Sequence, residues 1–168
     1  MNKDTLNTIF FFVGLILLQI VVLNHINFLG YINPFLYILF IFYYPIKKID
    51  SQLIFLSFFL GLSIDIFSNS GGVNAAATLF IAFIRIPVLK SVIGKREIDS
   101  TINNINKLPY GKVFAYIIIL TFIHHFIVFG LEYFKWNNFR IIISKTLLTS
   151  VFTIILIMIS YTFIARKK

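Results

Sequence analysis

The ionisable side chains inside long apolar stretches of the chain include Asp65, Arg85 and the adjacent His124 and His125. A carboxylate or an imidazole can give and take protons in catalysis, and an arginine can pair with a carboxylate. Charged groups are costly in an apolar environment, so these residues are the first candidates for a functional role.

The spacing of the two histidines argues against a shared catalytic or metal site. Adjacent residues point about 100° apart around a helix, and they lack the i, i+4 spacing with which two histidines of one helix bind one ion. We expect one of them to hydrogen-bond within the fold, with a proton relay as the alternative. An enzyme that acts on lipids through His124, His125 and Asp65 is disfavoured, because the histidines fall in the middle of one apolar stretch and Asp65 near the end of another.

Recognised catalytic motifs are absent from the sequence. It contains no glycine-rich phosphate loop, no His-Glu-x-x-His, no Gly-x-Ser-x-Gly and no cysteine. The sequence therefore predicts a protein that is not an enzyme and that has no cofactor or metal.

Asp65 and Arg85 occur in consecutive apolar stretches that are joined by a polar turn. If the second stretch becomes helical near Asn74, Arg85 lies about 17 Å further along it, so a direct pair is not expected. We expect the Asp65 carboxylate either to hydrogen-bond the following turn or to contact a partner or ligand. The Arg85 guanidinium is expected to snorkel to the inner headgroups beside Pro87.

The elements that carry these residues are apolar blocks of membrane-spanning length. The chain has 168 residues, 59% of them hydrophobic, and 21 are Phe. The sequence predicts an all-α integral membrane protein, a six-transmembrane-helix bundle in one domain over residues 1–168. The predicted helices cover about residues 9–23, 29–46, 53–67, 75–89, 114–134 and 141–165. The second lies between Pro34 and Pro45, and either spans the bilayer or is re-entrant.

The basic residues give the predicted helices an orientation. Of the 15 Lys and Arg residues, eleven fall on the side of the two termini if there are six spans. The positive-inside rule then predicts that both termini are cytoplasmic. The net charge of +9 is accordingly an orientation signal, and binding to nucleic acid is not expected.

Two connections and one helix contact can be predicted in more detail. The glycine-containing turn 68–74 is expected to form a tight hairpin on the outer side. In the cytoplasmic loop 90–112, Ile98, Ile102 and Ile105 recur at helical spacing, which fits either an amphipathic helix on the inner leaflet or a polar linker, and less well a partner site. Gly61 and residues 75–77 are small, so the helices 53–67 and 75–89 should pack closely, while Gln19 and Ser63 should donate hydrogen bonds between helices.

Two segments resemble the bacterial rod shape-determining protein MreD family. The first is 18–27, followed by Gly30, Tyr31, Pro34, Phe35, Leu36 and Tyr37, which resembles the amino-terminal part of that family. The second is 61–68, followed by Gly72, Asn74, Ala75, Ala76, Phe83 and Arg85, which resembles its signature hairpin.

The resemblance implies a fold, a location and partners. The fold would be similar to the six-helix substrate-binding subunits of energy-coupling factor transporters, in the bacterial cytoplasmic membrane. The protein would be a non-enzymatic subunit of the cell-elongation complex that binds MreC directly, and RodA, its transpeptidase partner and MreB through the complex. The candidate partner-binding or structural residues are Gly61, Asp65, Ser68, Asn74, Ala76 and Arg85.

An alternative function is a transport subunit that holds a small molecule in an outward-facing pocket between helices. Such a site needs convergent polar groups near the outer mouth. The candidates are Asn24, His25, Asp65, Asn69 and Asn74, all of which could instead cap helices.

Overall fold

The computed structural model describes residues 3–27, 32–46, 51–94, 105, 108–134 and 138–165, and these residues form helices joined by turns. The long helices among them are α1 (Lys3–Val21), α3 (Ser51–Ser68), α4 (Val73–Ile93), α6 (Tyr110–Glu132) and α7 (Phe139–Ala165). This part of the chain contains 5 helices that are long and apolar enough to cross a membrane. The all-helical fold is thus confirmed for the described residues, which are compatible with a multi-pass membrane protein.

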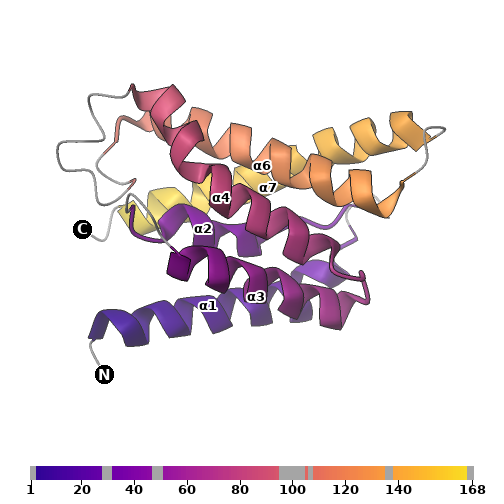
Figure 1. Cartoon of the computed structure of the whole chain (residues 1–168), viewed down its shortest axis with the longest axis horizontal. Coiled ribbons are helices and arrows are strands. Elements are labelled where there is room, and N and C mark those ends of the chain that lie inside the picture. The colour runs from indigo at the N-terminus through magenta and orange to yellow at the C-terminus, as the bar shows by residue number, and fades with distance from the viewer. Residues whose placement is uncertain are drawn as a thin grey trace.

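The five long helices run roughly lengthwise through the molecule (Figure 1). The beginning of α1 and the end of α7 lie at one end, which we call the terminal end. The turn between α3 and α4 and the connection between α6 and α7 lie at the opposite end, which we call the hairpin end. Five lengthwise helices alone would leave the two chain ends on opposite sides of the molecule. Because both ends lie on the same side, the chain must pass lengthwise once more between α1 and α3.

That passage is made by residues 32–46, where a sixth transmembrane helix was predicted. Only η2 (Leu36–Ile38) and α2 (Leu39–Tyr43) are helical there, and eight residues of helix are too few to cross a bilayer core of about 30 Å. Tyr44 leaves the helix with an extended ψ of 138°, as expected for a residue that precedes a proline. The prediction of six spanning helices is therefore not confirmed.

The short helix is enclosed by the long helices. Tyr37, Ile38 and Ile41 are each 0% exposed, and Phe40 and Phe42 are each 1% exposed. Irregular backbone at membrane depth is tolerated where protein covers it instead of lipid. Residues 32–46 therefore pass through the bundle as a short helix with extended ends and not as a long helix.

The contact between α3 and α4 is very close at Gly61. A Cβ atom at this position would lie 2.5 Å from the Asn74 carbonyl oxygen and 2.6 Å from the Ala75 Cα. Only glycine allows the two backbones to approach this far, as predicted from the small residues. Ala76, one of the small residues 75–77 that were expected at this contact, is exposed.

The two predicted hydrogen-bond donors differ in what they bind. Gln19 is 0% exposed, and its Nε2 donates to the Pro34 carbonyl (2.9 Å) while its Oε1 accepts from the Tyr37 amide (3.4 Å). It thereby fixes the start of the enclosed segment to α1. Ser63 donates to the Phe59 carbonyl of its own helix (2.8 Å), so the prediction of an interhelical bond was wrong for Ser63.

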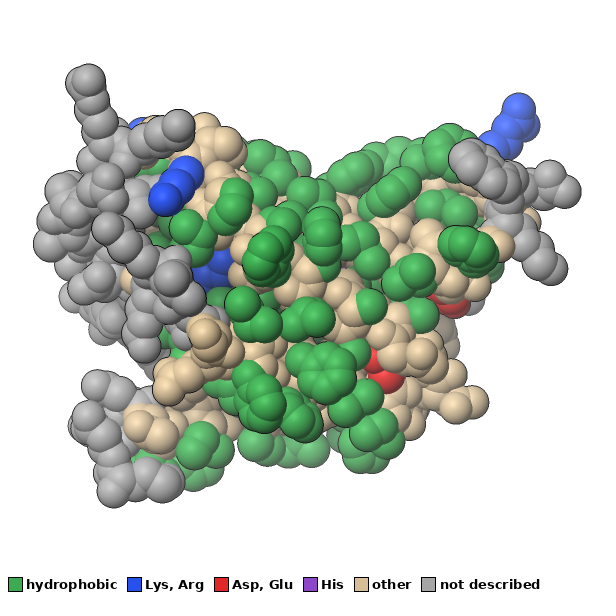
Figure 2. All heavy atoms as spheres, viewed as in Figure 1, with side chains coloured by type: hydrophobic (Ala, Val, Ile, Leu, Met, Phe, Trp, Pro, Cys, Tyr) green, Lys and Arg blue, Asp and Glu red, His purple; other side chains and the backbone are tan. Residues whose placement is uncertain are grey.

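The surface of the bundle is largely apolar. Figure 2 shows hydrophobic side chains across the middle of one face, with Lys and Arg side chains toward the ends. The most exposed large side chains include Phe10, Ile66, Phe67 and Phe83, as expected of helices that face lipid. Ile98 and Ile102 of the predicted amphipathic helix lie outside the described residues.

Candidate functional site

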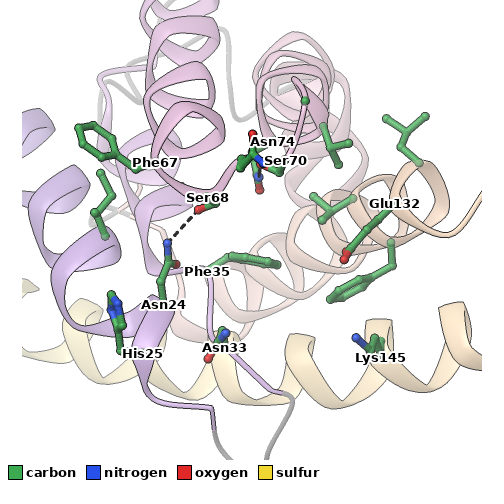
Figure 3. A pocket seen from close by; sticks show the side chains of 17 residues that line it. Asn24, His25, Asn33, Phe35, Phe67, Ser68, Ser70, Asn74, Glu132 and Lys145 are labelled. Carbon is green, nitrogen blue, oxygen red and sulfur yellow. Dashed lines mark hydrogen bonds between the residues drawn. The ribbon is translucent and has the colours of Figure 1, made fainter.

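A cavity of about 810 Å³ opens at the hairpin end (Figure 3). We call it the hairpin-end cavity. Its walls come from the end of α1 and η1 (Leu23–His25), the α3–α4 turn, α6 and α7, with residues 33 and 35 contributing from the enclosed segment. Its polar and charged lining residues are Asn24, His25, Asn33, Ser68, Asn69, Ser70, Asn74, Glu132 and Lys145.

Asp65 lies behind this lining and caps α4. Its Oδ1 accepts from the Asn74 amide nitrogen (3.0 Å), the Asn74 side-chain nitrogen (3.0 Å) and the Ser70 hydroxyl, while its Oδ2 accepts from the Ala75 amide nitrogen (2.7 Å). The N-cap residue of α4 is Gly72, which has no side chain to cap the helix. Asp65 supplies the missing acceptor from the preceding helix, so of the two predicted roles the structure shows hydrogen bonding to the following turn.

The backbone of the α3–α4 turn explains how Asp65 reaches across it. Asn69, Gly71 and Gly72 have positive φ angles of 51°, 67° and 92°, a conformation that Gly and Asn adopt most easily. This tight hairpin was predicted from the sequence. Ser68, the last residue of α3, accepts a hydrogen bond from the Asn24 side chain (2.9 Å) and so joins the hairpin to η1.

A chain of hydrogen bonds leads from Asp65 into the bundle. The Tyr37 hydroxyl donates to Asn74 Oδ1 (2.9 Å) and lies 3.0 Å from His124 Nε2. Because the hydroxyl hydrogen is used on Asn74, the His124 Nε2–H must donate to the Tyr37 oxygen. His124 Nδ1 is then an acceptor, and it has no hydrogen-bond partner among the described residues.

This network connects two ionisable residues that the sequence places at different depths. Asp65 lies near the end of one apolar stretch and His124 in the middle of another, and the side chains of Asn74 and Tyr37 join them. Sequence reasoning missed Tyr37, whose hydroxyl in an apolar run signals a buried partner. The network joins α3, α4, η2 and α6, and therefore fixes the enclosed segment against the hairpin.

His125 binds a different part of the bundle. Its Nδ1 is 2.7 Å from the Thr121 carbonyl oxygen and its Nε2 is 3.1 Å from the Thr153 hydroxyl oxygen. The same hydroxyl accepts from the Phe35 amide (3.1 Å). The two histidines thus point to different elements, as their spacing predicted, and both hydrogen-bond within the fold.

Arg85 is buried, with 1% of its surface exposed. Its guanidinium donates to the carbonyl oxygens of Ile41 (2.9 Å), Tyr44 (3.1 Å) and Pro45 (2.8 Å). The prediction that Arg85 snorkels to the headgroups was wrong, because α2 ends inside the bundle and its last carbonyls need donors there. Arg85 and Asp65 bind different segments of the chain.

Lys145 and Glu132 add charge to the wall of the cavity opposite η1 (Figure 3). The Lys145 ammonium donates to the Tyr133 hydroxyl and lies 4.8 Å from the Tyr133 ring centroid and 5.9 Å from that of Phe129. The sequence signal for Lys145 was its place inside an apolar stretch, but it was not assigned to a site.

Four of the five residues predicted to line an outward pocket do line this cavity: Asn24, His25, Asn69 and Asn74. The fifth, Asp65, reaches it only through Ser70 and Asn74. No protein-family model, no curated protein and no solved structure matches this chain.

Proposed function

We propose that this chain is a non-enzymatic membrane subunit of the bacterial cell-elongation complex, related in role to MreD. It would lie in the cytoplasmic membrane with both termini cytoplasmic and the hairpin end outside. It would bind MreC directly and meet RodA, its transpeptidase partner and MreB through the complex.

The observation that carries this proposal is that the two MreD-like segments meet in space. They lie apart in the sequence, at residues 18–37 and 61–85, yet Asn24 bonds Ser68 (2.9 Å) and Tyr37 bonds Asn74 (2.9 Å). The polar residues that carry the resemblance therefore serve one shared feature, the junction of η1, η2 and the α3–α4 hairpin. The contact between the two MreD-like segments supports the proposal that this chain shares the fold of the MreD family.

The candidate residues divide into internal and external ones. Gly61, Asp65, Asn74 and Arg85 are buried, so they support the proposed function by holding the hairpin and the enclosed segment in place. Ala76 is exposed and shares one face of α4 with Phe80 and Phe83, which are 46% and 68% exposed. We place the contact with the membrane segment of MreC on this face, where a small residue lets another helix approach closely.

Regulation by such a subunit needs no catalysis. If the bundle binds one conformation of MreC more tightly than another, it shifts the balance between the inactive and active synthase by that difference in affinity. The hairpin end would then lie next to the outer domain of MreC.

The test is to crosslink the tagged protein in its native membrane, purify it in mild detergent and identify the captured partners by mass spectrometry. Recovery of MreC with RodA and its transpeptidase is expected. Ala76→Trp should reduce the recovery of MreC several-fold, whereas Val151→Trp, at an exposed site on α7, should not. Normal recovery of MreC with Ala76→Trp, at equal protein levels, would contradict the proposed contact.

The cavity favours one second candidate, a membrane subunit that binds a small molecule for transport. A volume of about 810 Å³ is within the range of ligand sites, and its polar groups converge from several helices. Under this proposal the same purification would recover an ATPase module or a tightly held small molecule in place of MreC.

A further inference from the structure

The hairpin-end cavity contains two opposite charges that are not paired with each other. Lys145 belongs to α7, and Glu132 is the last residue of α6. Both side chains point into the cavity from the same wall (Figure 3). Within the described part of the chain, neither forms an ion pair with the other or with another residue. The cost of an unpaired charge in an apolar environment falls on Lys145, which is half-buried within α7, whereas Glu132 is exposed at the end of α6.

The ammonium of Lys145 is oriented by its neighbours. One of its three donors is used on the Tyr133 hydroxyl, and the rings of Tyr133 and Phe129 lie beside it. These contacts hold the charge without neutralising it, and two N–H groups remain for a ligand.

We propose that the hairpin-end cavity binds a zwitterion, with its phosphate or carboxylate at Lys145 and its amine at Glu132. Both side chains line the same cavity, so one bridging molecule can contact both charges, whereas a simple anion would be attracted by Lys145 alone. Phe35 and Phe129 also line the cavity, and their aromatic rings can pack against the uncharged part of the ligand.

Two sources can supply this chemistry at the end of a membrane helix bundle: the headgroup of a phospholipid such as phosphatidylethanolamine, and a free amino acid or amino phosphate. The site is compatible with either function proposed above, because a scaffold can bind a lipid and a transport subunit can bind a solute.

Binding can be measured by calorimetry on the purified full chain in uncharged maltoside micelles. The probes are dihexanoyl phosphatidylethanolamine, O-phosphoethanolamine, and dihexanoyl phosphatidylglycerol, which has the phosphate but no amine. We expect Lys145→Gln to weaken binding of the ethanolamine probes about ten- to hundred-fold, as for loss of a charge-assisted hydrogen bond. Glu132→Gln should abolish the preference for phosphatidylethanolamine over phosphatidylglycerol.

Arg140→Gln is the matched control, since Arg140 is an exposed cation at the start of α7 and does not line the cavity. An unchanged melting temperature in each variant establishes that the fold is kept. Binding of phosphatidylethanolamine alone identifies a lipid headgroup, and equal binding of O-phosphoethanolamine identifies a soluble zwitterion. The proposal is overturned if the folded protein binds no probe, or if Arg140→Gln weakens binding as much as Lys145→Gln.

Discussion

Replacing Asp65 with Ala should destabilise the bundle at the α3–α4 hairpin. The change leaves the amide N–H groups of Asn74 and Ala75 without the acceptor that now lies 3.0 Å and 2.7 Å away. Both belong to the first turn of α4, where no intrahelical acceptor exists. An unsatisfied buried donor costs about 1–3 kcal/mol, and loss of a helix cap costs about 0.5–2 kcal/mol.

The expected loss of unfolding free energy is about 2–4 kcal/mol, because both donors are buried and the loss lies between that of one helix cap and that of two unsatisfied buried donors. Asp65→Asn should lose roughly half as much, since its amide oxygen can still accept one of the two bonds. The assay is equilibrium unfolding in mixed maltoside and dodecyl sulfate micelles, followed by far-UV circular dichroism.

Ser63→Ala is the matched control for this prediction. Ser63 also lies on α3, and its hydroxyl bonds only the Phe59 carbonyl of the same helix, so its loss should change stability by less than about 0.5 kcal/mol. If Asp65→Ala proves as stable as Ser63→Ala, the carboxylate does not cap α4 and the argument from the hydrogen bonds fails.

Two further predictions use the same unfolding assay. Gly61→Ala should cost about 1–3 kcal/mol, because its Cβ would lie 2.5 Å from the Asn74 carbonyl oxygen, whereas Gly14→Ala should cost nothing, because its Cβ would have no neighbour within 4 Å. Equal stability of the two variants would show that α3 and α4 can separate freely. Arg85→Met should be destabilising because it removes these donors from the buried carbonyl of Ile41 and the partly buried carbonyls of Tyr44 and Pro45. Arg85→Lys should rescue part of the loss, and full stability of the Met variant would show that the guanidinium does not support α2.

The helices and the hairpin could be predicted from sequence because each is encoded locally. An apolar run sets the length of its own helix, and the glycines of the 68–74 turn set its backbone. The contact at Gly61 was also predictable, since small residues occur on both helices. These features need no knowledge of what lies across the bundle.

The path of residues 32–46 and the burial of Arg85 could not be predicted from sequence, because each depends on the contact with the other. The apolar run between Pro34 and Pro45 is too short to span as a helix, and nothing local indicates that other helices cover it. Arg85 looked like an arginine at a helix end, yet its acceptors Ile41, Tyr44 and Pro45 lie about 40 residues earlier in the sequence. Similarly, Lys145 and Glu132 come together only through the packing of α6 and α7.

The support that Arg85 gives to α2 has a consequence for the order of biogenesis. Residues 32–46 are synthesised before α4, so the last carbonyls of α2 are made about 40 residues ahead of the guanidinium that they bind. The segment cannot be released into lipid as an independent helix. Its final place is gained only when α4 has formed, so the fold of the first half of the protein is incomplete until residue 85 has been synthesised.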